Sequence, residues 1–331
     1  MNIAARPGEP GRALADIVLD VLDDDEHRRT RIAHLYYIEG RTQAEIAEQL
    51  GISRVKVVRD LAICRETGLV QIRINGRLAS CVRLERDLQA RFGLKEVLVV
   101  PTPSDPEGIP AVLGMAVGAY ISDRLQPGKT IGIGWGSTLH WSVRAVRRQK
   151  LPGVTVVSLL GGLGRGSEIN TYETASRLAD VLGAQCYYLA APTFASTTEL
   201  RDMLLEQPGL REIYDRALAA DLAVVSVGSL EPRSTNRRLG LLRDEEIAQL
   251  KALGCVGDLL GHLLDADGNI VEHELNRRVV GLSPVDLRAV PTALLASGGL
   301  DKVPVIRAAL RAGYVNTLIT DEAAAEALSA A

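Results

Sequence analysis

The residues with the clearest chemical use are three cations at positions 54 to 59. Arg54, Lys56 and Arg59 carry guanidinium and ammonium groups, which bind phosphate oxygens and donate hydrogen bonds to base edges in the DNA major groove. If Val57 and Leu61 face inward on a helix, all three cations are left outside. We therefore expect Arg54 and Lys56 at base edges or phosphates and Arg59 at phosphate. The alternative is a basic helix face that meets only solvent.

A glycine-rich loop at 131–139 (IGIGWGSTL) has the residue types of a ligand-binding loop. Gly134 and Gly136 let a backbone approach a ligand closely. Ser137 and Thr138 would begin the following helix, where free amides and the helix dipole favour an anion or a polyhydroxy compound. The loop can also be a tight strand-to-helix turn, and it is not a Walker A loop because Gly-Lys-Ser/Thr is absent.

Further polar loops follow other apolar runs of the chain. They stand where a parallel sheet would present the carboxyl ends of its strands, which is where such sheets bind ligands. These loops are Gly161-Gly162 with Asn170, Ala191-Pro192-Thr193, Gly228-Ser229, Gly257-Asp258, and Gly298-Gly299 with Lys302. Each alone is more often a turn, but their recurrence after strands favours one shared cleft.

The cations belong to a helix-turn-helix pattern at 42–61 (TQAEIAEQLGISRVKVVRDL). Gly51 permits a left-handed turn, Ile52 fills the space between the two helices, and Ser53 can cap the second helix. The residues expected to face inward are Ile46, Ala47, Leu50, Val57, Leu61 and Cys64. The expected DNA contacts are Thr42, Gln43, Ser53, Arg54, Lys56 and Arg59. The spacing favours insertion into the major groove over a solvated three-helix bundle.

Four elements are expected around this pattern. Apolar spacing predicts a short helix at 13–22 and another at 29–39, the latter with the apolar residues Ile32, Leu35, Tyr36 and Ile38. The segment 69–74 (LVQIRI) alternates like a strand and precedes the turn dipeptide Asn75-Gly76, so it could form a small wing. A charged connecting helix at 80–92, ended by Gly93, is expected to belong to neither core.

From position 97 onward, short β-branched runs alternate with helical segments. The runs are VLVV, TIGIGWG, VTVVSLL, QCYYLA, LAVVSVGS, AVPTALLAS and NTLIT. This alternation predicts an α/β domain with βαβ units and a mostly parallel, Rossmann-like sheet. The expected division of the chain is a flexible tail at 1–12, a helix-turn-helix DNA-binding domain at 13–78, a linker helix at 79–93 and a larger α/β domain at 94–331.

Composition limits the class of protein. The 331 residues are 47% hydrophobic and 24% charged, which suits an ordinary folded protein of two domains. The net charge of -3 still allows a local basic face. Four cysteines without a Cys-x-x-Cys pair indicate neither a disulfide framework nor a zinc site. No cofactor and no metal site are expected. No signal-peptide core or membrane-length apolar run is present in the sequence, so a cytoplasmic location is expected.

As an ordered set, these motifs resemble the SorC family of sugar-responsive transcriptional regulators. In that family a winged helix-turn-helix precedes an effector domain of the sugar isomerase and deaminase fold. The resemblance runs from about position 28 to near the C-terminus. It rests on the helix-turn-helix, GIGWGST, LGG followed by Asn170, GDLLGHLLDADG, SGGLDKVPVIRAAL and VNTLITDEAAAEAL.

The resemblance implies an effector site. Its residues would be Gly134, Trp135, Gly136, Ser137, Thr138, Leu139, Asn170, Asp258 and Lys302. Lys302 would supply a cation for a phosphate or carboxylate, or a donor to hydroxyls, and Asp258 would accept from a sugar hydroxyl. Family members commonly carry Phe where this chain has Leu263, which bears on the shape that faces the ligand, and His262 beside it is expected to be a partly exposed residue rather than a ligand.

Other residues are available to such an effector. Trp135 and Trp141 can stack on a sugar face, and Trp141 is expected to be the core member of the two. Phosphate recognition usually recruits Arg or Lys together with backbone amides. The arginines available for this are Arg165 and either Arg237 or Arg238.

The main hypothesis is a DNA-binding regulator of carbohydrate metabolism, either repressor or activator. It would bind operator DNA, respond to a sugar, polyol or sugar phosphate, and form a homo-oligomer, dimer or tetramer, with no membrane partner. The alternative is a sugar-phosphate isomerase or deaminase with an accessory domain, which needs a group to move a proton beside the substrate carbon. Asp258 is the only candidate in the expected cleft, and the five histidines form no catalytic arrangement, so no enzyme is expected. A third reading is a constitutive DNA-binding protein whose larger domain only oligomerises.

Overall fold

The computed structural model describes residues 24–70, 78–164, 169–232 and 234–330. The chain divides into two compact units, 1–75 and 76–331. The expected tail at 1–12 and helix at 13–22 lie outside the described residues, as do most of the expected wing strand at 69–74 and its Asn75-Gly76 turn.

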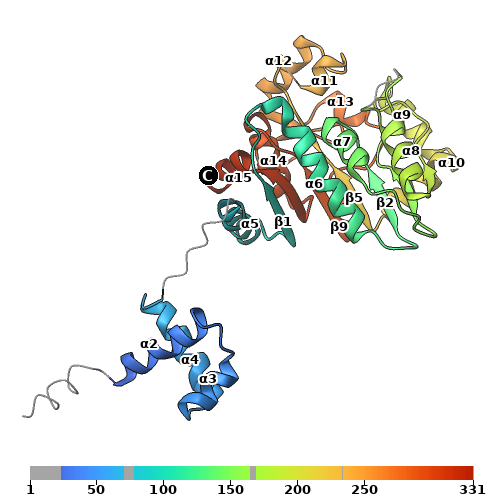
Figure 1. Cartoon of the computed structure of the whole chain (residues 1–331). Helices are drawn as coiled ribbons and strands as arrows, with labels where there is room; N and C mark the ends of the chain where they lie inside the picture. The colour runs from blue at the N-terminus through green and yellow to red at the C-terminus, as the bar shows by residue number, and fades with distance from the viewer. Residues whose placement is uncertain (1–23, 71–77, 165–168, 233, 331) are drawn as a thin grey trace, which may run out of the picture. The chain divides into compact units, whose positions relative to one another are not determined.

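The smaller unit is a bundle of the helices α2 (Asp24–Tyr37), α3 (Gln43–Leu50) and α4 (Arg54–Glu66) (Figure 1). Its core consists of Ile32, Leu35, Ile46, Ala47, Val57 and Leu61, with Leu50 and Ile52 packed against it. The inward face predicted for the two helix-turn-helix segments is therefore confirmed. Helix α2 ends at Tyr37, so Ile38, expected on its apolar side, is 73% exposed.

The larger unit is built on a seven-stranded sheet in the order β1-β10-β9-β5-β2-β3-β4. Every neighbouring pair of strands is parallel. The strands are β1 (Glu96–Val100), β2 (Thr130–Ile133), β3 (Thr155–Ser158), β4 (Gln185–Tyr187), β5 (Leu222–Val225), β9 (Thr292–Ala296) and β10 (Thr317–Asp321). Each falls in one of the predicted β-branched runs, and the predicted parallel α/β fold is confirmed.

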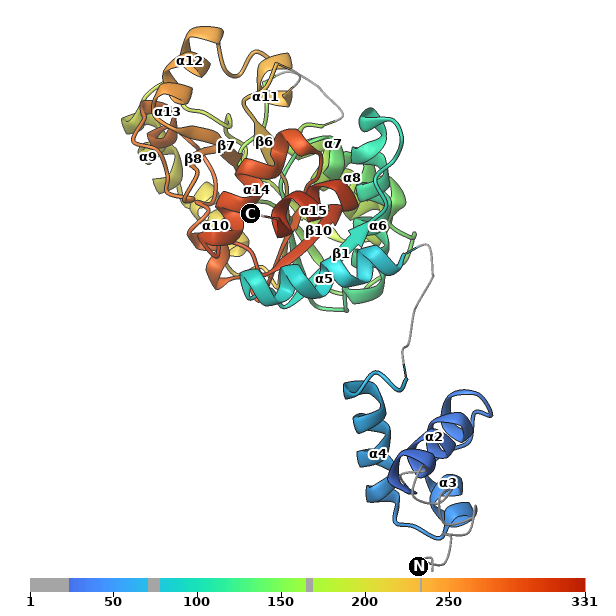
Figure 2. The ribbon, with the colours of Figure 1, turned by 90° about the vertical axis from the view of Figure 1, so that its left-hand side faces the viewer.

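Helices cover both faces of this sheet (Figures 1 and 2). One face packs against α6 (Ile109–Arg124), α7 (Ser137–Ala145) and α8 (Thr171–Leu182). The other packs against α5 (Ala79–Phe92), α10 (Pro208–Leu218), α14 (Val303–Arg311) and α15 (Glu322–Ser329). The central strand β5 is buried at every position, as a strand covered on both faces must be.

The structure corrects the expectation that helix α5 belongs to neither core. Its Cys81, Leu84 and Leu88 are buried in the main core of the larger unit. Glu85 also accepts a hydrogen bond at 2.9 Å from the amide of Val99 in β1. The apolar residues of this charged helix repeat along one side, which gives it a face to bury, so 79–93 is part of the larger unit.

A second, antiparallel sheet was not predicted. It consists of β6 (Val227–Ser229), β7 (Cys255–Leu259) and β8 (His262–Asp265). Together with α12 (Asp244–Ala252) and α13 (Glu274–Arg277) it surrounds a separate small core, and the short helix α11 (Thr235–Arg238) precedes α12 in the chain. The remaining described elements are helix α9 (Thr198–Glu206) and the 3-10 turns η1 (Pro106–Gly108), η2 (Asp286–Ala289) and η3 (Leu300–Lys302).

Candidate functional site

A cavity of about 1020 Å³ lies at the carboxyl ends of the parallel strands. Strands β3 and β4 continue the sheet on one side of β2, and β5, β9 and β10 continue it on the other. This reversal of strand order at β2 is a topological switch point, where open parallel sheets bind their ligands. Residues one or two positions after β1, β2, β5 and β9, and the last residue of β10, line the cavity.

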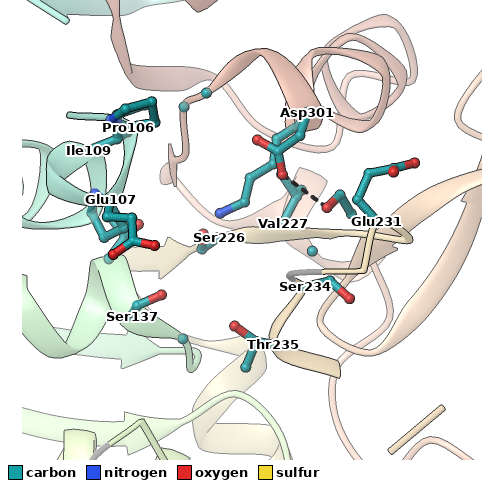
Figure 3. A pocket seen from close by; sticks show the side chains of 18 of the residues that line it. Pro106, Glu107, Ile109, Ser137, Ser226, Val227, Glu231, Ser234, Thr235 and Asp301 are labelled. Carbon is teal, nitrogen blue, oxygen red and sulfur yellow. Dashed lines mark hydrogen bonds between the residues drawn. The ribbon is translucent and has the colours of Figure 1, made fainter. Parts of the chain in front are cut away.

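The loop from β2 to α7 forms one wall, made by Trp135, Gly136, Ser137 and Thr138. Gly136 has φ 118° and ψ 167°, a conformation that only glycine adopts without strain. No side chain caps α7, so its first backbone amides remain available to a ligand. In Figure 3 the Ser137 side chain reaches into the cavity from this wall.

Gly134 and Leu139, predicted in the same loop, do not line the cavity. A Cβ on Gly134 would stand 3.4 Å from a methyl of Leu260, so this glycine lies in the protein interior. Leu139 is fully buried in the core beneath α7. The four residues between them, 135–138, line the cavity, whereas Gly134 and Leu139 pack in the interior beneath the loop.

Asp258 on β7 provides a buried carboxylate in the lining. Its Oδ1 accepts a hydrogen bond from the Asn236 amide at 2.6 Å, and its Oδ2 accepts one from the Gly261 backbone at 3.1 Å. Gly228 lies opposite on β6, and a Cβ there would stand 2.3 Å from Oδ1. Burial, partly offset by these hydrogen bonds and by Lys302, raises the pKa of Asp258 to about 6.

Lys302 provides a partly buried cation in the lining, at the start of α14. Its side chain makes no hydrogen bond or ion pair with any residue that the structure describes. Burial lowers the pKa of its ammonium group, and the carboxylates of Asp301 and Asp258 oppose that shift. An ammonium group without a paired carboxylate is available to an oxygen-rich ligand.

Several lining residues were missed by the sequence predictions. Figure 3 shows the hydroxyl groups of Ser226, Ser234 and Thr235 around the cavity, beside the predicted Ser137, and the carboxylates of Glu107, Glu231 and Asp301. Asp301 accepts from the Ser229 hydroxyl at 3.0 Å, drawn as the dashed line. The wall also includes Asp321 at the end of β10. Asp321 could have been found as the polar residue directly after the predicted strand NTLIT, whereas Ser226 lies inside the predicted run LAVVSVGS.

Asp321 is fixed within this wall. Its Oδ2 accepts from the Thr102 hydroxyl at 2.6 Å and its Oδ1 from the amide of Gly299 at 2.7 Å. A Cβ on Gly298 would stand 2.2 Å from Oδ1, so only glycine fits there without displacing the carboxylate. The carboxylate thus ties the loops after β1 and β9 to the end of β10.

Asn170 is not part of the cavity lining, contrary to the prediction. It caps helix α8, and its side chain accepts from the amide of Leu163 at 3.2 Å and donates to the Leu163 carbonyl at 3.1 Å. The neighbouring loops at 161–162 and 191–193 also lie outside the lining, bound to each other through the Thr193 hydroxyl and the Gly161 carbonyl at 2.9 Å. The cavity therefore includes only some of the loops that were predicted to share one cleft.

The two tryptophans have the opposite roles to those expected. Trp135 is buried to 9% exposure against the main core, and Trp141 is 41% exposed, although both line the cavity. Trp141 lies where α7 meets α6, with its Cβ against Gly114, and Arg144 stacks over its exposed ring at 5.2 Å. A ligand at this rim can still meet an aromatic face.

The remaining predictions concern the arginines suggested for phosphate recognition and the two residues 262 and 263 beside the expected site. Arg238 lines the cavity, Arg237 pairs with Asp244 at 2.7 Å, and Arg165 lies outside the described residues. His262 is a buried strand residue rather than a partly exposed one, and burial lowers its pKa to about 4. Leu263 belongs to the small core beside the cavity and not to its lining, so its departure from the family pattern does not reshape the wall.

In the smaller unit, Ser53 caps a helix as predicted, and Thr42, predicted only as a DNA contact, is also a helix cap. Thr42 caps α3 in a capping box with Glu45. Gly51 follows with φ 63°, and the Ser53 side chain then accepts from the Lys56 amide at 3.2 Å to cap α4.

Helix α4 presents its cations to solvent and buries its apolar side. Arg54, Lys56 and Arg59 are exposed, whereas Val57 is fully buried. Asp60, which was not predicted as important, is buried and accepts a hydrogen bond from the Arg28 Nε at 3.2 Å. This pair joins α4 to α2 and holds the cationic face outward.

A helix-turn-helix with an exposed cationic helix, together with an α/β unit that has an oxygen-rich cavity, defines a ligand-responsive DNA-binding protein. Residues 76–329 match the family model of a sugar-binding domain. The erythritol catabolism regulatory protein EryD of Brucella abortus is 34% identical over 309 residues, which cover 92% of this chain and 97% of that protein.

Two further comparisons agree. The deoxyribonucleoside regulator of Bacillus subtilis is 34% identical over 300 residues, covering 89% of this chain and 95% of that protein. The crystal structure of the full-length sorbitol operon regulator SorC from Klebsiella pneumoniae superimposes with a TM-score of 0.71 at 27% identity, covering 93% of this chain and all of that one. The chain belongs to the SorC family of sugar-responsive transcriptional regulators. The predicted family and class of function are confirmed.

None of the helices that the structure describes is both long and apolar enough to cross a lipid bilayer.

Proposed function

We propose that this chain binds operator DNA through α4 and that a small sugar, polyol or sugar phosphate in the cavity changes its affinity for that DNA. The observation that carries the effector half is the placement of Lys302, without a described ionic partner, in a hydroxyl-lined cavity at the switch point of the sheet. The exposed cations at the capped start of α4 carry the DNA half.

The lining suggests a role for each wall. Lys302 and the first amides of α7 donate to ligand oxygens, and Asp258 accepts from a ligand hydroxyl with the lone pairs that Asn236 and Gly261 leave free. Arg238 adds a second cation if the ligand carries phosphate. Carboxylates around the same cavity favour a ligand with several hydroxyl groups.

We also propose that the protein is a cytoplasmic homo-oligomer and not an enzyme. Symmetric oligomers match the repeated half-sites that helix-turn-helix proteins bind. An isomerase or deaminase needs a positioned proton carrier, and the described cavity lining contains no histidine. Both oxygens of Asp258 already accept hydrogen bonds, and the relatives are named as regulators.

The DNA half is tested by removing the exposed cations of α4. A duplex is first selected from a random pool by the unaltered protein. Combined Arg54→Ala and Lys56→Ala substitution is expected to weaken binding of that duplex by at least about 30-fold, because each base or phosphate contact contributes on the order of 1 kcal/mol or more. Fluorescence anisotropy measures the affinity.

The matched control removes two exposed cations from the larger unit, Arg148→Ala with Lys150→Ala. It should bind the duplex like the unaltered protein. Equal binding by the α4 double variant and this control would refute the assignment of the DNA contacts. Effector binding should survive in both variants.

The effector half is tested by thermal shift with erythritol, sorbitol, deoxyribose and their phosphates, chosen because the relatives are named for erythritol, deoxyribonucleosides and sorbitol. A ligand that binds only the folded state raises the melting temperature. Lys302→Met should lower the affinity of the active compound at least tenfold, while Lys150→Met should leave it unchanged. If the compound stabilises Lys302→Met as much as the unaltered protein, the cavity is not its binding site. Turnover of a sugar phosphate by the purified protein would support the enzyme alternative.

A further inference from the structure

Two valines on α4 are exposed where a helix of a folded protein normally presents polar groups. Val55 is 78% exposed and Val58 is 45% exposed. They lie three residues apart, so they are neighbours on one side of the helix. Val57, between them in the chain, is fully buried and already supplies the apolar contact that the bundle core needs.

Neither valine is explained by the stability of the helix. A β-branched side chain loses rotamer freedom in a helix and has a lower helix propensity than alanine or lysine. An exposed valine in the first turn therefore costs a little stability and gains no burial within the bundle. A surface that covers the two side chains when the protein is bound to a partner would supply the missing burial.

The surrounding charges identify the chemistry of that partner. Arg54, Lys56 and Arg59 are exposed on the same helix, and Ser53 caps its N-terminus, which carries the positive end of the helix dipole. An apolar strip among cations fits an anionic surface that also carries apolar groups. The major groove is such a surface, because thymine presents a 5-methyl group beside the phosphate backbone.

We propose that Val55 and Val58 read the 5-methyl groups of thymines in the operator, and that this contact sets part of its sequence specificity. The inference rests on the proposed binding of DNA through α4. The cations position the helix through phosphates or guanine edges, and the valines favour thymine over cytosine at the bases they cover. Removing one covered methyl should weaken binding by about fourfold, given the free energy of burying one such group.

The test replaces each thymine of the selected duplex in turn with deoxyuridine, which removes only the 5-methyl group. The unaltered protein should lose about fourfold in affinity at one or two positions of each half-site and nothing elsewhere. Val55→Ala or Val58→Ala should abolish the difference between thymine and uracil at its own position, while total binding of the uracil duplex stays within about twofold. Both variants should fold, because the two side chains are exposed and alanine favours helix.

The control is Val82→Ala, which shortens a valine of the larger unit that is 53% exposed and should preserve every uracil effect. The inference is overturned if uracil costs nothing at any position, or if both α4 variants keep the full discrimination. Failure of the proposed function has a different result: no duplex is selected from the pool, or the Arg54 and Lys56 double variant binds as well as the unaltered protein.

Discussion

At the scale of single residues, Asp258 carries the most distinctive electrostatics of the proposed effector site. Its carboxyl is buried beside Lys302, and its pKa rises from the usual 3.8 to about 6. The native state therefore binds this proton more tightly than the unfolded chain does. Stability is lost as the pH rises from about 4 through 6, because the buried carboxyl must ionise.

We predict that Asp258→Asn removes this pH dependence. The shift of the pKa corresponds to a cost on the order of 3 kcal/mol for the ionised group, so the stability of the variant relative to the unaltered protein should rise by about that amount between pH 4 and pH 7. Urea unfolding at four pH values measures the difference. A difference that does not change with pH would contradict the assigned burial of the charge.

His262 changes the stability with pH in the opposite direction, so the prediction compares the variant with the unaltered protein at each pH. Burial lowers its pKa from 6.5 to about 4, so the folded state keeps it neutral and stability is lost as the pH falls from about 6.5 to 4. The two effects oppose each other over the same pH range in the unaltered protein. His262 is present in both proteins of the comparison, so its contribution drops out.

Residue roles could be predicted from the sequence where the local pattern determines them. Ser53, Gly51 and Val57 follow from helix capping, turn geometry and helical period, which are properties of neighbouring residues. Asn170 could not be placed, because a polar residue after a strand can cap the next helix or face a ligand, and only the tertiary structure decides. Trp141 was misassigned because the sequence does not show which side of α7 other elements cover.

At the scale of elements, the strand-to-helix turn before α7 determines one wall of the cavity. Gly136 takes a conformation that costs other residues about 1 to 3 kcal/mol. We predict that Gly136→Ala lowers stability by that amount and also weakens effector binding, because the strained turn moves the first amides of α7. Urea unfolding and thermal shift with the active compound measure the two effects.

Gly93 supplies the matched control for this turn. It ends α5 with φ 64°, has open space around its missing Cβ, and is not part of the cavity lining. Gly93→Ala should destabilise the protein by about 1 kcal/mol and leave the affinity for the effector unchanged. If both variants weaken effector binding equally, the turn has no special role in the site.

The parallel elements were predictable, and the antiparallel ones were not. Strands such as β5 are buried on both faces, so their sequences are continuous apolar runs that stand out from the helices between them. The hairpin of β7 and β8 turns at Leu260 and Gly261 instead of the common Asn-Gly. Its sequence, CVGDLLGHLLD, also lacks the regular alternation of apolar and polar residues that predicts a strand. That hairpin carries Asp258, so this residue was named from the sequence while the element that positions it was not.

At the scale of the whole molecule, one chain carries the proposed DNA-binding unit and the unit with the proposed effector cavity. A ligand changes DNA binding only if it has different affinities for two states of the protein. The coupling must also be reciprocal, so operator DNA changes the affinity for the effector by the same factor. The division into two units was foreseen from the change in composition, but helix α5 could be assigned to the larger unit only through its packing on β1 and α15.

The most direct test of the central claim is the operator affinity of the full chain with and without the compound that stabilises it. We predict that a saturating amount of the compound changes the dissociation constant for the selected duplex at least about fivefold, a typical allosteric coupling. Lys302→Met should bind the duplex normally and no longer respond at the same concentration. A compound that stabilises the protein through Lys302 and yet leaves operator affinity unchanged would contradict the account.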